Sequence, residues 1–263
     1  MKIFFKNLLR LKQSLVAIWF FKETFKVIYN YLFVSSISYQ EKPKPYYGGS
    51  ILSNFGGPSV KIKKLNLFFP ENNWNFNIIY LLSNSINLNS LSIDLIKKKG
   101  LPIVLNQNGV FYPSWFEGNW KKENLKMSKI YHSANYVFWQ SNFCKKTSEK
   151  FLGKRIGEGE ILYNSIDTSF FTPKIKAFNN RFTFLITGNL RKRNNYRVKC
   201  VLGALKTLIA ENKNIELIIA GFIEDKNYLY KEISNLKLED HIIFQKTYTQ
   251  KEAPEIYNQA DAY

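Results

Sequence analysis

The stretch that decides the fold covers residues 181–221 and reads RFTFLITGNLRKRNNYRVKCVLGALKTLIAENKNIELIIAG. It begins with a short apolar run that ends in Gly188, a pattern typical of a buried strand. Residues 196–211 then show a helical pattern, because their apolar side chains recur on one stripe. That stripe consists of Val198, Val201, Leu202, Leu205, Leu208 and Ile209. A second apolar run, residues 215–221, ends in Gly221 and completes a strand–helix–strand unit with parallel strands.

The same alternation extends to both sides of this unit. Further strands are predicted at residues 77–85, 101–109, 136–141, 160–167 and 241–244. Further helices are predicted at residues 86–98, 119–134, 141–153, 228–236 and 251–260. In the first of these helices, Leu88, Leu91 and Leu95 are predicted to form the buried stripe. Alternating strands and helices predict an α/β fold in which helices cover parallel sheets on both faces.

The segment 41–50, EKPKPYYGGS, marks a break because proline and glycine favour turns. We therefore predict three regions: a helical segment and linker at residues 1–44, an α/β domain at 45–165 and a second α/β domain at 166–263. The sequence reaches Tyr263 where the alternation predicts the start of another strand. The second domain is therefore expected to be incomplete, as in a fragment or a truncated product.

The composition is that of a strongly basic globular chain, with 263 residues and a formal net charge of +18. This charge favours anionic partners: nucleic acid, an anionic membrane surface or a phosphorylated ligand. A bias toward residues with AT-rich codons is an alternative source of part of the charge. Cys144 and Cys200 form no CxxC pair and are expected to be buried and reduced. With only His132 and His241 present, a structural zinc site and a histidine-based triad are not expected.

The N-terminal segment mixes large apolar residues with basic ones. Its basic residues include Lys2, Lys6, Arg10, Lys12, Lys22 and Lys26. The uninterrupted apolar stretch, residues 15–21, is too short to span a bilayer. Two interpretations stay open: an amphipathic helix that lies in an anionic membrane surface, or a helix packed on the protein's own core. The expected location is the cytoplasm, with peripheral contact to the inner face of the cell membrane under the first interpretation.

A basic loop follows the strand that ends in Gly188, at the sheet edge where α/β folds bind ligands. Residues 187–195 read TGNLRKRNN, and the next helix is expected to begin near Asn194 or Asn195. The free N–H groups of a helix N-terminus, together with Arg191 and Arg193, suit a diphosphate. The alternative is a solvated basic loop without a ligand.

A second candidate loop, residues 54–59, reads NFGGPS. Gly56 and Gly57 would let a phosphate or a sugar approach backbone N–H groups, because neither carries a side chain. A single Gly-Gly pair is a weak signal compared with the basic loop.

Five phrases occur in an order that carries a family resemblance. They are residues 134–153, 161–173, 184–195, 215–222 and 255–263. The chain from residue 101 to residue 263 resembles glycosyltransferases of the GT-B fold, of the retaining family-4 type. In that family a phrase NxxDxxxF.P joins two Rossmann-like domains, and it is matched by Asn164, Asp167, Phe171 and Pro173. A phrase lY..AD before the last donor-binding segment is matched by Tyr257, Ala260 and Asp261.

The sequence departs from the family pattern in three places. The Arg and Lys that usually hold the donor diphosphate are replaced by Asn189 and Asn194. The His-Gly pair of the first domain is replaced by Asn108 and Gly109. The paired-glutamate motif of the family lies beyond Tyr263, so the catalytic residues stay unknown and an inactive truncated chain is an alternative reading.

The resemblance implies transfer of a sugar from a nucleotide-diphosphate sugar to an acceptor hydroxyl, with retention and without a bound metal or cofactor. The acceptor class would be a glycan, a lipid-linked glycan or a cell-surface polysaccharide. The residues that would hold the donor diphosphate are Gly188, Arg191 and Arg193. Those that would contact the acceptor or sugar are Gly56, Gly57, Gln107 and Asn108. A nucleic-acid partner is not expected, because the aromatic residues fall mostly in core patterns rather than among surface cations.

Overall fold

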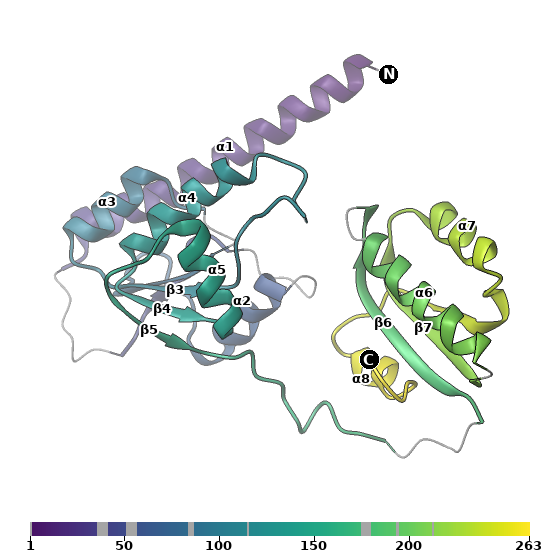
Figure 1. Ribbon diagram of the computed structural model, residues 1–263. Helices are drawn as coiled ribbons and strands as arrows, with labels where there is room; N and C mark the ends of the chain where they lie inside the picture. Colours follow the sequence, from purple (N-terminus) through teal and green to yellow (C-terminus); the bar gives the residue numbers. More distant parts are fainter. Residues whose placement is uncertain are drawn as a thin grey trace. The chain divides into compact units, whose positions relative to one another are not determined.

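The computed structural model describes residues 2–35, 42–50, 57–83, 87–114, 116–174, 180–192, 195–211 and 213–263, with side chains from Ile18 onward. The chain divides into two compact units. One unit contains Met1–Tyr112 and Asn119–Asn164, and the other contains Pro113–Gly118 and Ser165–Tyr263. Each unit has a parallel sheet with helices packed against it (Figure 1). The α/β class predicted from the alternating pattern is therefore confirmed.

The first unit is built around a five-stranded parallel sheet in the order β1-β2-β3-β4-β5. Its strands are β1 (Pro45–Tyr46), β2 (Ile78–Leu82), β3 (Ile103–Gln107), β4 (Tyr136–Trp139) and β5 (Glu158–Ile161). Its helices are α1 (Lys2–Phe33), α2 (Gly57–Phe68), α3 (Ser90–Lys98), α4 (Trp120–Ser133) and α5 (Asn142–Leu152). Ser141 caps α5, because its Oγ accepts from the backbone N–H of Cys144 at 3.0 Å.

Side chains that alternate along β2 separate the two faces of this sheet. Ile79 and Leu81 lie in the larger core, to which α1, α3, α4 and α5 also contribute. Tyr80 and Leu82 point to the opposite face, where Ile62 of α2 packs against Leu82. This two-residue period is the ordinary consequence of strand geometry. It places α2 on the opposite face of the sheet from the larger core.

The structure corrects the predicted buried stripe of α3. Leu91 was expected inside the core but is 53% exposed, whereas Ile93 and Ile96 are buried. Asn89 sets where the helix begins, since its side chain accepts from the backbone N–H of Ser92 at 2.8 Å. Packing of Ile93 and Ile96 in the core defines the buried side of the helix, which leucine spacing alone did not reveal.

The C-terminal half of α1 packs on the first unit with its polar side inward. Glu23, Lys26 and Asn30 are buried, together with Val27. Lys26 Nζ donates to both carboxylate oxygens of Glu23 at 3.0 Å, and Tyr46 on β1 donates to the same carboxylate. Residues 1–44, which the sequence analysis separated from the first domain, thus include a helix that packs within this unit. Among the described residues, no helix is long and apolar enough to cross a membrane.

The second unit contains a three-stranded parallel sheet in the order β6-β7-β8. Its strands are β6 (Phe182–Leu190), β7 (Ile215–Ile223) and β8 (Ile242–Gln245). Its helical segments are α6 (Asn195–Ala210), α7 (Lys226–Leu236), the short 3₁₀ helix η2 (Glu239–His241) and α8 (Ala253–Tyr257). Ala262 forms a parallel bridge with Phe184 of β6, so the strand predicted near Tyr263 begins beside β6.

Helices cover both faces of this second sheet. Leu217 and Ile219 of β7 belong to the core formed with α6 and α7. Ile218 and Ala220 belong to a smaller core with Ile256 of α8. The predicted apolar stripe of α6 faces the first of these cores. Cys200 corrects another expectation, because it lies exposed on α6, whereas Cys144 is buried as predicted.

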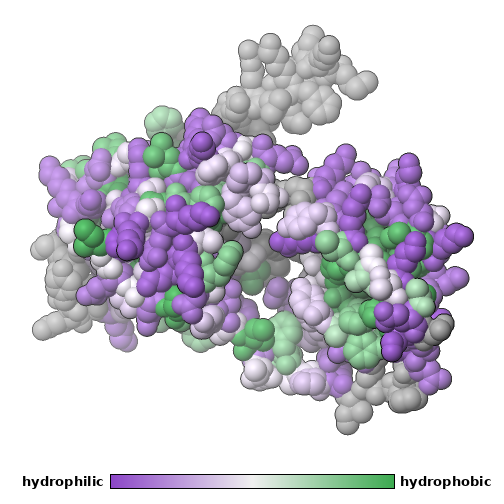
Figure 2. All heavy atoms as spheres, viewed as in Figure 1, coloured by the Kyte–Doolittle hydropathy of each residue, from purple (hydrophilic) through white to green (hydrophobic). Residues whose placement is uncertain are grey.

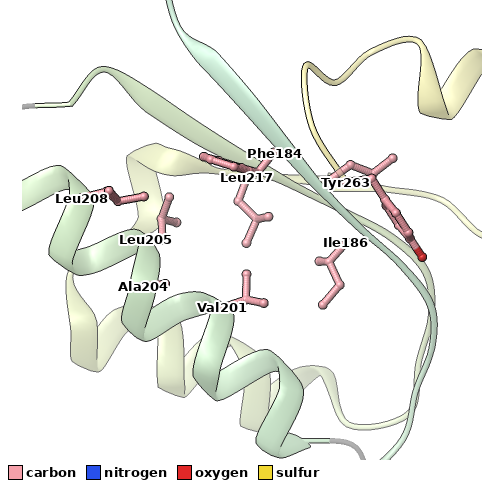
Figure 3. A pocket seen from close by; sticks show the side chains of 9 residues that line it. Phe184, Ile186, Val201, Ala204, Leu205, Leu208, Leu217 and Tyr263 are labelled. Carbon is pink, nitrogen blue, oxygen red and sulfur yellow. The ribbon is translucent and has the colours of Figure 1, made fainter. Parts of the chain in front are cut away.

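An apolar cavity of about 360 Å³ lies between α6 and β6. Its lining includes Phe184, Ile186, Val201, Leu205 and Tyr263, whose side chains surround the space in Figure 3. Figure 2 shows hydrophobic side chains gathered over the same two elements. The cavity lies beside the middle of β6 and not at its carboxyl end. Its lining offers little to a charged ligand, because polar groups in such a space would lose their water without a partner.

Candidate donor-binding site

The carboxyl end of β6 is a topological switch point. On one edge β6 pairs with β7, and on the other it pairs with the segment at Ala262, both in parallel. The backbone N–H of Leu185 donates to the carbonyl of Ala262 at 2.9 Å. The helix that follows β6, α6, and the helix that precedes the Ala262 segment, α8, cover different faces of the sheet. Such a point opens a crevice beyond the strand ends, where open α/β sheets bind their ligands.

Gly188 occupies this crevice, as the sequence analysis proposed. Its φ is +122°, and a Cβ built on it would meet no heavy atom within 4 Å. Open space therefore lies next to its backbone. Gly221 sits opposite Gly188 in the β6–β7 register, and a Cβ there would lie 2.3 Å from the carbonyl oxygen of Gly188. The two glycines let the strands approach closely where the candidate site begins.

Three hydroxyl groups line the same strand end. Thr187 Oγ1 donates to the hydroxyl of Tyr263 at 3.1 Å and lies 3.4 Å from the hydroxyl of Tyr257. The rings of the two tyrosines lie 5.3 Å apart between centroids. Burial raises the pKa of Tyr257, so its hydroxyl keeps its proton and can donate. Sequence spacing gives no signal for this cluster of hydroxyls, because residues 187, 257 and 263 meet only in the fold.

The basic loop is less positive than its sequence indicates. Lys192 Nζ lies 3.6 Å from a carboxylate oxygen of Asp225, and its backbone N–H donates to Glu224 at 2.9 Å. Arg191 is exposed and forms no ion pair with any described residue. Arg193 lies outside the described residues. Among the described residues, Arg191 is therefore the proposed phosphate-binding cation, and it lies just before α6.

The residues proposed for the acceptor occupy different environments in the first unit. Gln107 is fully buried, and its amide donates to the carbonyl of Gly109 at 2.6 Å. This burial argues for a role in holding the loop rather than for a contact with a ligand. Asn108 is partly exposed at the carboxyl end of β3, and its backbone N–H donates to Ser83 Oγ at 2.9 Å. Gly57 begins α2 with open space around it, and Gly56 lies outside the described residues.

Within the described residues, no group of three or more His, Cys, Asp and Glu side chains could hold a metal ion. The described residues of the site at β6 offer backbone N–H groups, hydroxyls and the guanidinium of Arg191. Such groups can bind a diphosphate by hydrogen bonds and charge.

The second unit is similar to a known protein family. Residues 167–263 match the model of the family described as glycosyl transferases group 1. This segment is therefore similar to glycosyl transferases group 1 domains. It contains β6, the basic loop and the α8 segment, which carried much of the resemblance seen in the sequence. No curated protein matches the chain in a sequence search.

Solved glycosyltransferase structures share the fold of the chain and support the GT-B architecture. Anabaena HepE, solved in complex with UDP, is 14% identical with a TM-score of 0.54, over 77% of this chain and 54% of HepE. Sucrose-phosphate synthase from Thermosynechococcus elongatus is 10% identical with a TM-score of 0.53, over 76% and 51%. A glycosyltransferase from Rickettsia africae is 16% identical with a TM-score of 0.50, over 87% and 57%. The chain thus spans about half the length of these proteins.

Proposed function

We propose that this protein transfers a sugar from a nucleotide-diphosphate sugar to an acceptor hydroxyl, with residues 167–263 binding the donor. The observation that carries the proposal is the switch point at Gly188, where open backbone, hydroxyls and Arg191 meet at the start of α6. UDP in the HepE structure supports a nucleoside diphosphate as the ligand class. The acceptor would belong to a glycan, a lipid-linked glycan or a polysaccharide.

The proposed chemistry needs charge stabilisation at the leaving group. The acceptor oxygen forms a bond to the anomeric carbon while the bond from that carbon to the diphosphate oxygen breaks. The diphosphate leaves with the electron pair, and its departing oxygen takes up the acceptor proton. Arg191 and the N–H groups at the start of α6 would stabilise the negative charge that develops on the diphosphate. By the family resemblance, the anomeric configuration would be retained and no metal ion would be required.

Replacing Arg191 with alanine is expected to weaken UDP binding roughly tenfold or more, because a charge-assisted hydrogen bond is lost. Isothermal titration of the 263-residue chain with UDP, in buffer containing EDTA, measures this change. The matched control is Lys192→Ala, which removes a cation that is already paired with Asp225. Its effect on the dissociation constant should be threefold or less. Equal UDP affinity in wild type and R191A would refute the role of Arg191, and a need for added Mg²⁺ would refute binding without a metal.

We also propose that α1 contacts an anionic membrane surface. Its outward face, which we call the aromatic face, exposes Ile18, Phe21, Phe25, Tyr29, Leu32 and Phe33. Phe21 is 77% exposed, while the charged pair of the same helix is buried. This polarity is the reverse of that of an ordinary surface helix, whose apolar side faces the core. Trp74 extends the aromatic face through ring contacts with Phe25 and Tyr29. The net charge of +18 would add attraction to anionic lipid.

The double variant Phe21→Ser/Phe25→Ser is expected to lower the partition onto phosphatidylglycerol vesicles roughly tenfold or more, because two buried aromatic contacts are lost. Cosedimentation with vesicles measures the partition, and phosphatidylcholine vesicles should bind the wild type weakly. The control is Leu125→Ser, since Leu125 is 64% exposed on α4 and is not part of the aromatic face. Unchanged binding by the double variant would rule out the aromatic face as a membrane contact.

A further inference from the structure

Lys61 reaches from α2 to the carboxyl end of β3. Its Nζ donates to Asn106 Oδ1 at 3.1 Å, and Asn106 is almost fully buried. Ile62, the next residue of α2, is completely buried and anchors the helix at this place. The Lys61 ammonium is half-buried, so it has lost part of its water without leaving the surface.

Among the described residues, Lys61 has Asn106 as its hydrogen-bond acceptor and forms no ion pair. The buried Lys26 differs, because Glu23 neutralises it directly at 3.0 Å. Lys99 differs as well, because oxygens of Asn30 and Val34 surround its ammonium. The segments 51–56 and 84–86, near Lys61 in the sequence and at the end of β2, contain no Asp or Glu. Burial lowers the pKa of Lys61, which means that its charged form lacks compensation in the free protein.

Polar side chains gather at the same sheet edge. Ser83 follows β2, Asn108 follows β3 and Gln140 follows β4. Ser83 Oγ accepts from the backbone N–H of Asn108 at 2.9 Å, and the amide of Gln140 donates to Asn108 Oδ1. The backbone N–H of Ser83 donates to the carbonyl of Asn106 at 3.0 Å, which holds the ends of β2 and β3 together. A cation beside hydroxyl and amide groups at the ends of parallel strands is suited to an anion with several oxygens.

We propose that Lys61, with the polar groups of Ser83, Asn108 and Gln140 beside it, binds a phosphate group of the acceptor substrate. The acceptor of this transferase would then be a phosphorylated or phosphodiester-linked molecule rather than a neutral sugar. The inference that this ligand is the acceptor rests on the proposed function. Phosphate binding at Lys61 can be tested without that function. The anion supplies the negative charge that the described surroundings of Lys61 do not.

The test is a titration of the 263-residue chain with glycerol 3-phosphate, followed by ³¹P NMR, with glycerol as the neutral comparison. UDP is present at saturation so that it occupies the donor site. Lys61→Met is expected to weaken glycerol 3-phosphate binding roughly tenfold or more, because a charged donor is lost. Lys61→Arg keeps the charge and should stay within about threefold of the wild type. Lys64→Met removes an exposed lysine of the same helix and should leave the affinity unchanged.

Equal affinity for glycerol 3-phosphate in the wild type and Lys61→Met would overturn the proposal. Weaker UDP binding by Lys61→Met, with glycerol 3-phosphate binding unchanged, would place Lys61 at the donor and also overturn it. If Lys61→Met fails to fold, Lys61→Gln takes its place and is judged by the same affinities. A wild type that binds glycerol 3-phosphate but not UDP would defeat the proposed donor function and leave the phosphate site standing.

Discussion

Replacing Gly221 with alanine is expected to destabilise the second unit by roughly 3 kcal/mol, because a new Cβ would both clash and be strained. The added atom would lie 2.3 Å from the carbonyl oxygen of Gly188, which belongs to the backbone and cannot rotate away. Gly221 also has a φ of +118°, which residues with a side chain rarely adopt. Since Gly188 forms part of the candidate donor site, UDP affinity should fall together with stability.

Amide hydrogen exchange of peptides from β6 and β7 measures this loss locally. Peptides from β2 and β3 of the first unit, followed in the same experiment, serve as the internal reference and should keep their exchange rates. The matched control is Gly203→Ala on the exposed side of α6, where an added Cβ meets nothing within 4 Å. That variant should be more stable by about 1 kcal/mol, because alanine favours a helix over glycine. Similar exchange rates in Gly221→Ala and wild type would show that the strands can separate without cost.

Replacing Lys26 with methionine is expected to lower the free energy of unfolding of the first unit by about 3–5 kcal/mol, because it leaves a buried carboxylate without its cation. The side chains of Lys26 and Glu23 are only 9% and 3% exposed. Glu71 lies close enough to feel the charge of Lys26, and burial raises the pKa of Glu71. Methionine keeps the length of the lysine stem, so the loss reports on charge rather than on volume. Urea unfolding followed by tryptophan fluorescence measures it.

The chain offers a matched control for this pair. Glu123 and Lys126 of α4 form an ion pair with the same spacing and a similar distance, 2.9 Å, but Lys126 is 62% exposed. Lys126→Met should cost about 1 kcal/mol or less, since water already screens an exposed pair. If the two variants lost equal stability, burial of the Glu23–Lys26 pair would not be the cause.

Much of the site could be predicted because its signals are local. Residues 181–211 alone indicate a strand near Gly188, then basic residues, then a helix. The structure has β6 and α6 in this order, with the basic residues between them. The phase of α6 was also predicted correctly, since six apolar residues fix one stripe. The buried side of α3 was not, because apolar residues lie on both sides of this helix and only packing selects Ile93 and Ile96 over Leu91.

The amino-acid sequence by itself determined the α/β class, most of the strands and helices from residue 77 onward, and the position of the basic loop after β6, because each depends on periodicity and turn residues within one segment. Only the tertiary structure decided which charges are paired, which polar groups are buried and which apolar residues are exposed. It neutralised Lys192 with Asp225, buried Gln107, turned the charged side of α1 inward and brought Lys61 to Asn106, 45 positions away in the chain. These outcomes depend on packing between distant segments, which the spacing of residues along a single segment does not reveal.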